Sequence, residues 1–98
     1  MHGVKRLLWW ILAGSAGGLN RGRILQELMG QPRNANDLSK VLGLDYKTIR
    51  HHLKILMKNN LITFSGSGYG QMYFISDLLE KNIDYFKEIW NKIGKNKK

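Results

Sequence analysis

The stretch from Asp45 to Asn60 constrains the fold of this chain more than any other part of the sequence. On a helix that advances about 100° per residue, its cationic side chains fall within one arc of roughly 100°, namely Lys47, Arg50, His51, Lys54 and Lys58. The opposite side collects apolar side chains, Ile49, Leu53 and Leu56. Asp45 places a side-chain oxygen where the first backbone N–H groups need an acceptor, which predicts an N-cap. A helix that is apolar on one side and basic on the other is typical of elements that enter a DNA major groove.

Length and charge set limits on the rest of the chain. With 98 residues, the sequence predicts one small domain, 1–98, with a thin core that would benefit from an additional interface. Sixteen Lys and Arg against seven Asp and Glu give a formal net charge of +9. Between Leu38 and Ser76 the sole acidic residue is Asp45, which the cap already uses. The positive excess therefore lies in the middle of the chain, as expected for a surface that binds a polyanion.

The residue types also exclude some classes of function. The sequence contains no cysteine, so disulfides and thiolate metal sites are excluded. His51 and His52 are adjacent, and neighbouring helix residues do not face each other, so no metal site is expected. No nucleophile stands beside a base and no glycine loop opens a helix to hold phosphate. We therefore expect neither an enzyme nor a cofactor.

Residues 1–18 are predicted to form an apolar helix followed by a glycine-rich linker. Val4, Leu7, Leu8 and Ile11 have helical spacing, and Trp9 and Trp10 fill much of the remaining circumference. The apolar run is short for a secretory signal and far too short to span a bilayer. We expect a packed helix in a cytoplasmic protein, with some of its partners on a second subunit; a role at a membrane surface is the alternative.

Residues 19–75 are predicted to form the central domain. Asn20 is the expected N-cap of a helix that ends at Gly30, with Arg21 and Arg23 in its exposed first turn. Its buried stripe is expected to comprise Ile24, Leu25 and Leu28. Pro32 lies in the turn that follows. Asn34 and Asp37 then resemble a capping box at the start of a short helix.

A tight turn is predicted between this short helix and the basic one. Gly43 stands where a left-handed C-terminal residue is needed, and Leu44 alone separates it from the Asp45 cap. Two helices joined so closely, with glycine at the start of the turn, are typical of a helix-turn-helix.

After Asn60 the pattern changes to that of a hairpin. Residues 61–64 and 72–75 are short β-branched and aromatic runs, and glycine occupies every second position from Gly66 to Gly70 between them. One interpretation is an ordinary β-turn. The other is a wing over 61–75 whose tip, with Ser67 and Tyr69, contacts DNA. The absence of acidic residues across the hairpin favours the wing.

A terminal helix is predicted over 76–93, followed by a basic tail, 94–98. Its apolar residues are spaced 4, 3, 4, 3, which makes a two-heptad seam that needs a cover. We expect this helix and the first one to form a homodimer contact, through Leu7, Leu8, Ile11, Leu79, Ile83, Phe86, Trp90 and Ile93.

The order of these elements resembles a known family. The predicted fold is mainly α with a small β-hairpin, a winged helix-turn-helix flanked by N- and C-terminal helices. The run of residues 36–56 closely resembles the ArsR-like transcription regulators, especially their archaeal branch, and the likeness extends from about 20 to 75. It implies dimeric binding to double-stranded DNA, with a recognition helix over 46–59 in the major groove and the wing beside it.

The resemblance also implies roles for individual residues. The base-facing positions of the family correspond here to Tyr46, Lys47, Arg50 and His51, and we place Thr48 on the same DNA surface. Lys54 and Lys58 lie further along the backbone-facing edge. Arg50 suits either a guanine or a phosphate, and both interpretations stay open at this point. Metal sensing does not carry over without cysteines. The alternatives to DNA binding are a protein-interaction module on the same frame or a regulator tethered to a membrane surface.

Overall fold

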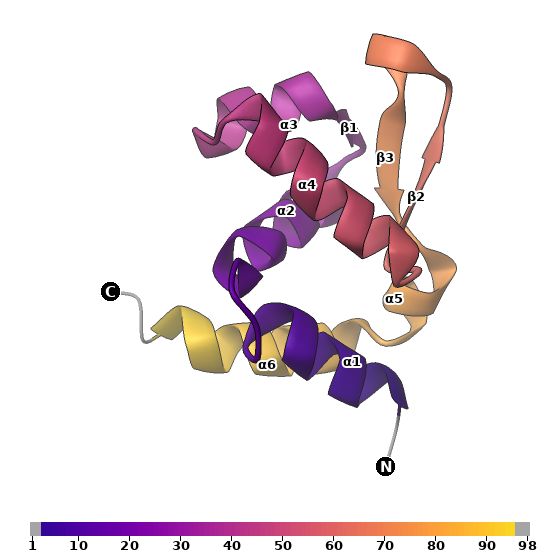
Figure 1. The fold of residues 1–98 in the computed structure, drawn as a ribbon. Coiled ribbons are helices and arrows are strands. Elements are labelled where there is room, and N and C mark those ends of the chain that lie inside the picture. Colours follow the sequence, from indigo (N-terminus) through magenta and orange to yellow (C-terminus); the bar gives the residue numbers. More distant parts are fainter. Residues whose placement is uncertain (1–2, 96–98) are drawn as a thin grey trace.

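The computed structural model describes residues 3–95, and Figure 1 shows this part as a helical domain with one hairpin. The described chain contains six α-helices: α1 (Gly3–Leu12), α2 (Gly18–Gly30), α3 (Ala35–Leu42), α4 (Tyr46–Lys58), α5 (Asp77–Lys81) and α6 (Ile83–Lys95). Its strands are β1 (Arg33–Asn34), β2 (Ile62–Ser65) and β3 (Met72–Ile75). The predicted fold class, mainly helical with a small β-hairpin, is therefore confirmed. Residues 96–98 of the predicted tail lie outside the described part.

The hairpin belongs to a three-stranded antiparallel sheet with the order β1-β3-β2. Ile62 pairs with Ile75 and Ser65 with Met72, and a short 3₁₀ turn, Gly68–Gly70, lies at the tip. The sequence predicted a turn where β1 forms. Arg33 pairs with Tyr73, which places β3 between two other strands. The wing is thus joined to the link between α2 and α3 through the half of β3 that lies nearer the hairpin tip.

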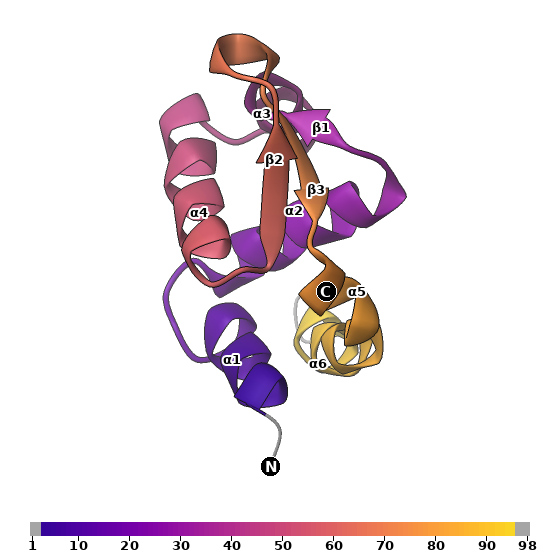
Figure 2. The same ribbon diagram turned by 90° about the vertical axis from the view of Figure 1, so that its right-hand side faces the viewer.

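The core lies between α2, α3, α4 and the inner side of the sheet. Its fully buried side chains come from all of these elements, among them Leu25, Leu38, Ile49, Leu53 and Tyr73. Burial of apolar surface of this kind contributes roughly 1.5–3 kcal/mol for each large aliphatic side chain. Figure 2 shows α4 on one side of the hairpin and α2 behind it, with α1, α5 and α6 gathered at the opposite end from the wing tip.

The terminal helices pack on each other within one chain. Helix α1 lies against α6 and α2, and Lys5 forms an ion pair with Glu88 across the first of these contacts (3.6 Å). Four of the residues expected at a dimer contact are buried in this intrachain core, namely Leu8, Ile11, Leu79 and Phe86. For these four, the expectation of contact with a second copy is corrected, because the domain's own helices cover them. Leu7, Ile83, Trp90 and Ile93 stay partly exposed.

Two of the predicted helices differ from those in the structure, one in where it begins and one in being broken. Helix α2 begins at Gly18 rather than after an Asn20 cap, because glycine there allows α2 to approach the Leu12 carbonyl more closely than a Cβ would permit. Gly17 precedes it in the left-handed conformation (φ 84°). The last helix divides at Asn82, whose backbone N–H donates to Leu79 O (2.9 Å). After this break α6 turns to run along α1 (Figure 1).

Gly22 marks a second close approach, between α2 and α6. A Cβ at this position would overlap the six-membered ring of Trp90, which itself stacks on Phe86 with ring centroids 5.9 Å apart. The absence of a side chain at Gly22 therefore sets how closely α6 lies against α2. Among the helices of residues 3–95, none is long and apolar enough to cross a membrane.

Gly22→Ala is expected to lower the free energy of unfolding by about 1–3 kcal/mol, because the added methyl group forces the Trp90 ring out of place. The matched control is Gly30→Ala at the end of the same helix, where a Cβ would have open space around it. There the better helix propensity of alanine should leave stability unchanged or raise it by up to about 1 kcal/mol. Urea unfolding of both variants measures the difference. Equal effects of the two substitutions would contradict the packing of Trp90 on Gly22.

Candidate nucleic-acid interface

The turn between α3 and α4 is built from local signals that the sequence carries. Asn34 accepts a hydrogen bond from the Asp37 backbone N–H (2.7 Å) and so caps α3, as predicted. Gly43 adopts the predicted left-handed conformation (φ 67°). Ser39 then closes the turn, because its backbone carbonyl accepts from Leu44 N (3.1 Å) and its hydroxyl donates to Leu44 O (2.6 Å). The turn has little freedom, and the direction of α4 follows from it.

Helix α4 begins at the predicted cap and buries the predicted side. Asp45 accepts a hydrogen bond from Lys47 N (3.0 Å). The apolar residues Ile49, Leu53 and Leu56 are buried, and His52 is buried beside them. With this side packed on the core, the opposite side of α4 has to face solvent.

The structure exposes the residues expected to contact DNA. Thr48 is half-buried in the first turn of α4, and the others are exposed: Tyr46, Lys47, Arg50, His51, Lys54 and Lys58 on α4, and Ser67 and Tyr69 at the hairpin tip. The hairpin tip lies at the end of the molecule farthest from α1 and α6, and α4 crosses in front of the hairpin's helical support (Figure 1). We call the exposed side of α4 together with the hairpin tip the basic face.

No acidic side chain neutralises the cations of this face. The ion pairs among the described side chains join Lys5 and Lys92 to Glu88, and Arg33 to Glu27. All of them lie outside α4 and the hairpin. The positive charge of Lys47, Arg50, Lys54 and Lys58 is therefore available to an external anion.

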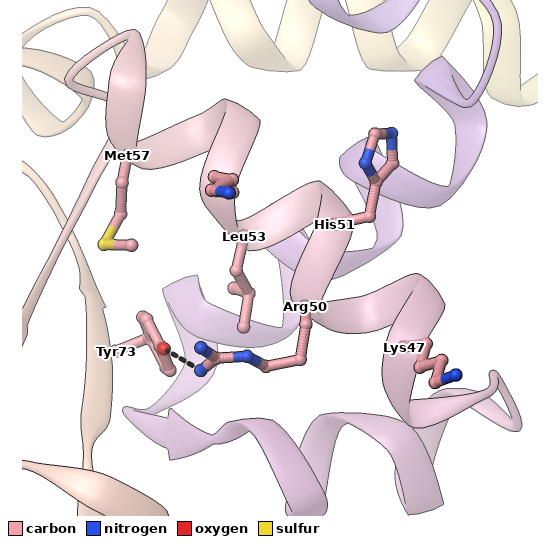
Figure 3. A pocket seen from close by; sticks show the side chains of 7 residues that line it. Lys47, Arg50, His51, Leu53, Met57 and Tyr73 are labelled. Atoms are coloured by element: carbon pink, nitrogen blue, oxygen red, sulfur yellow. Dashed lines mark hydrogen bonds between the residues drawn. The ribbon is translucent and has the colours of Figure 1, made fainter.

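Arg50 differs from the other cations of the face because it reaches toward the hairpin. Its Nη1 donates a hydrogen bond to the Tyr73 hydroxyl on β3 (3.1 Å), whereas Lys47 and His51 extend away from Tyr73 (Figure 3). Beside this bond lies a hollow of about 360 Å³ with an apolar floor that includes Leu53 and a cationic rim. Arg50 thus links the exposed side of α4 to strand β3 of the wing.

A second hollow opens on the other side of Arg50, toward the hairpin tip. It has a volume of about 420 Å³ and is lined by Tyr46, Arg50, Gly68, Tyr69 and Gln71. Sequence reasoning placed Tyr46 and Tyr69 near DNA but missed Gln71 and Tyr73. The alternation of the strand could have placed Tyr73 inward, but not the partners of its hydroxyl.

A buried arginine, which the sequence analysis wrongly placed at the surface, supports α4 from behind. Arg21 is 2% exposed. Its Nε donates to Ile11 O (3.1 Å), and its Nη2 donates to Ser15 Oγ (2.6 Å) and Ala16 O (3.0 Å). Its position in the first turn of α2 predicted exposure, but the linker after α1 folds over it. Arg21 therefore ties this linker to α2.

The same arginine contacts α4 through His52. Arg21 Nη1 lies 3.3 Å from His52 Nδ1. Because a guanidinium can only donate, Nδ1 has to accept, which leaves the proton of the neutral ring on Nε2. Burial lowers the pKa of His52 below its ordinary value, and the charges of Arg21 and His51 lower it further. Burial also lowers the pKa of Arg21.

The described part of the chain offers no metal site. Nowhere in residues 3–95 do three or more His, Asp or Glu side chains gather closely enough to hold a metal ion.

A tight helix-turn-helix followed by a hairpin beside its second helix defines the class of this protein, a winged helix-turn-helix protein. Within it, residues 20–63 match the family model described as bacterial regulatory protein, arsR family. The resemblance to ArsR-like winged helix-turn-helix regulators that the sequence motifs indicated is confirmed over these residues. A comparison of the sequence with curated proteins gave no match.

Solved structures with the same fold include several regulators. HlyU from Vibrio vulnificus, described as a transcriptional regulator, superposes with a TM-score of 0.66 at 18% identity, over 89% of this chain and 88% of that one. Rv0081 from M. tuberculosis gives a TM-score of 0.68 at 17% identity, over 98% and 97%. The transcriptional regulator YodB from B. subtilis, in its reduced form, gives 0.64 at 16% identity, over 94% of each chain. At these identities the likeness is one of fold.

We predict that the free energy of unfolding falls as the pH is lowered below about 6.5, the ordinary pKa of histidine. Since the pKa of His52 is lower in the folded chain than in the unfolded one, the unfolded chain binds the proton more tightly in this range. The contribution of His52 to the free energy of unfolding is complete above the pKa of this residue in the unfolded chain. It declines by at most about 1.4 kcal/mol per pH unit as the pH falls to the pKa of His52 in the folded chain.

Urea unfolding between pH 7.5 and 5.5 measures this slope. His52→Gln should flatten it, whereas the matched variant His51→Gln, at the exposed neighbouring position, should retain it. Parallel stability curves for the native chain and His52→Gln would show that His52 does not carry the effect.

Proposed function

We propose that this chain is a transcription regulator that binds double-stranded DNA as a homodimer, with α4 in the major groove and the wing on the flanking backbone or minor groove. One observation carries the proposal: the cations of α4 are exposed, lack acidic partners and stand beside the hairpin. A major groove about 12 Å wide accepts an α-helix, and unpaired cations on such a helix replace the counterions of the phosphates. The ArsR-family match over 20–63 supports the same function.

The positions along α4 suggest a division of roles. Arg50 lies in the middle of the helix and can donate two hydrogen bonds to guanine O6 and N7, which discriminates against other bases by roughly 1–3 kcal/mol. His51, the next residue along α4, is assigned with Arg50 to the bases of the major groove. Tyr46, Lys47 and Thr48 lie at the helix N-terminus, where backbone N–H groups favour phosphate. Lys54 and Lys58, further along, are assigned to phosphates.

The wing supplies the second contact. Ser67 and Tyr69 are exposed at its tip. The tip contains a 3₁₀ turn, Gly68–Gly70, in which Tyr69 carries the one side chain and the flanking glycines leave the backbone accessible. A tip of this kind can lie close to a sugar-phosphate backbone and donate from N–H or hydroxyl groups. Tyr69 offers an aromatic ring and a hydroxyl to the groove beside it.

The homodimer is proposed from the outward side of α1. Trp9 and Trp10 are 48% and 54% exposed, and they lie on the side of the helix opposite the buried Leu8 and Ile11. Large exposed aromatic side chains that lie together are typical of an interface. A second copy is the occupant that the proposed function needs, since two recognition helices one helical turn apart read two half-sites.

A lipid surface is the second candidate partner for this tryptophan pair. Trp side chains favour the interface between water and hydrocarbon, and the exposed Arg6 on the same helix would meet anionic headgroups. Co-sedimentation with anionic vesicles, using the intact chain, separates the lipid candidate from the dimer.

A protein-interaction module is disfavoured, because it would have no use for four unneutralised cations on one face of α4.

We predict different effects of two substitutions in α4 on DNA binding. Arg50→Ala should reduce the affinity ratio between a duplex selected from a random pool and a random duplex by about tenfold or more, because it removes a base contact. Lys58→Ala should weaken binding to both duplexes alike and reduce the slope of log K against log salt by about one unit, because it removes a phosphate contact. Mobility-shift titrations at two salt concentrations measure both quantities.

Equal losses in both variants on both duplexes would contradict the division of roles. A native chain that binds neither duplex at low salt would contradict DNA binding itself.

We also predict that sedimentation equilibrium at micromolar concentration gives twice the 11.3 kDa mass of one chain. Replacing both Trp9 and Trp10 by alanine should weaken the dimer by about tenfold or more, since buried tryptophans dominate interface energies. The matched control is Phe64→Ala on the wing, which removes an aromatic side chain of equal exposure, 48%, away from α1. A native mass of one chain would rule out the dimer at this concentration.

A further inference from the structure

Behind the basic face, three side chains form a short hydrogen-bonded chain. Arg50 Nη1 donates to the Tyr73 hydroxyl (3.1 Å), and that hydroxyl donates to Gln71 Oε1 (3.1 Å). Arg50 belongs to α4, whereas Gln71 and Tyr73 belong to the returning arm of the hairpin. Its first bond, between Arg50 and Tyr73, joins α4 to the wing through side chains (Figure 3).

The direction of each hydrogen bond follows from the chemistry of the groups. A phenol has a single O–H, and here it points to Gln71, so the lone pairs of the oxygen are left for Arg50. The guanidinium has five N–H donors and uses one of them, on Nη1, in this bond. Its Nε and Nη2 edge stays available, and that edge has the fork geometry that guanine O6 and N7 accept.

Tyr73 is well suited to hold another residue but not to contact DNA. It is 1% exposed and stands on the central strand, where its backbone partners are Arg33 on one side and Phe64 on the other. A side chain with so little accessible surface cannot itself contact a base or a phosphate. Any effect of its hydroxyl on DNA binding has to act through the exposed side chain that it holds, Arg50.

We propose that Tyr73, with Gln71 behind it, is a positioning residue that holds the Arg50 guanidinium in the orientation that reads a base. This inference rests on the proposed function. An arginine without such support loses side-chain conformational entropy when it docks, and it can equally turn to a nearby phosphate. With one Nη1 bond already formed to a rigid strand, the guanidinium meets the groove in a single orientation. The wing thus contributes to sequence discrimination from a position that DNA does not reach.

Tyr73→Phe tests the proposal, because it keeps the buried ring and removes the hydroxyl. We expect the affinity ratio between the selected and the random duplex to fall by about threefold to tenfold. The salt dependence of random-duplex binding should stay unchanged, since no phosphate contact is lost. Tyr85→Phe is the matched control, because it removes the same group from α6, at the other end of the molecule, and should leave the ratio unchanged.

The Arg50→Ala background makes the test specific. If Tyr73 acts through Arg50, adding Tyr73→Phe to Arg50→Ala should cause no further loss of discrimination. Gln71→Ala, at a half-buried position outside the core, is a second variant that should give a smaller loss in the native background and none in the Arg50→Ala background. It decides the question if Tyr73→Phe lowers the melting temperature into the assay range.

The outcomes separate this inference from the proposed function. If the native chain selects a duplex and Arg50→Ala loses discrimination, but Tyr73→Phe and Gln71→Ala keep the native ratio, the positioning role is wrong and DNA binding stands. A ratio that rises in Tyr73→Phe would show that the hydroxyl withholds Arg50 from DNA, which also overturns the proposal. If the native chain selects no duplex, the proposed function fails.

Discussion

The burial of one side of α4 is the interaction on which the rest of the structure depends. Ile49, Leu53 and Leu56 pack into the core, and this contact decides which side chains of the helix face outward. Because the helix repeats every 3.6 residues, burying this stripe turns the cations to solvent together. The Gly43 turn before α4 and the sheet after it limit its remaining freedom. Apolar packing on one side of the helix therefore arranges a charged surface on the other.

Polar contacts hold this arrangement at two points where packing alone would leave it loose. Behind α4, the buried Arg21 donates to the Ile11 carbonyl at the end of α1 and to the Ala16 carbonyl of the linker that follows, and it contacts His52. In front, Arg50 reaches Tyr73 on the central strand. Burying an arginine is costly unless its donors are satisfied, and here three backbone or hydroxyl oxygens and one ring nitrogen accept from it. The end of α1 and its linker are thereby coupled to α4.

Local signals in the sequence were enough to predict much of the fold. The Asn34 and Asp45 caps, the left-handed Gly43 and the two sides of α4 each depend on residues within one or two helical turns. The features that were missed depend on contacts between distant segments. Arg21 is buried because the linker after α1 folds over it. The predicted last helix is broken into α5 and α6, and α6 packs along α1. Tyr73 accepts a hydrogen bond from Arg50, which is 23 residues away in the sequence. No periodicity in the sequence reports such contacts.

The central claim is that α4 and the wing form the surface that meets DNA. Backbone amide NMR of the ¹⁵N-labelled chain, titrated with a short duplex at low salt, tests this most directly. We expect the largest shift changes in α4, Tyr46–Lys58, and in the hairpin from β2 to β3, with small changes in α1 and α6. Changes centred on α1 and α6, with α4 unaffected, would contradict it.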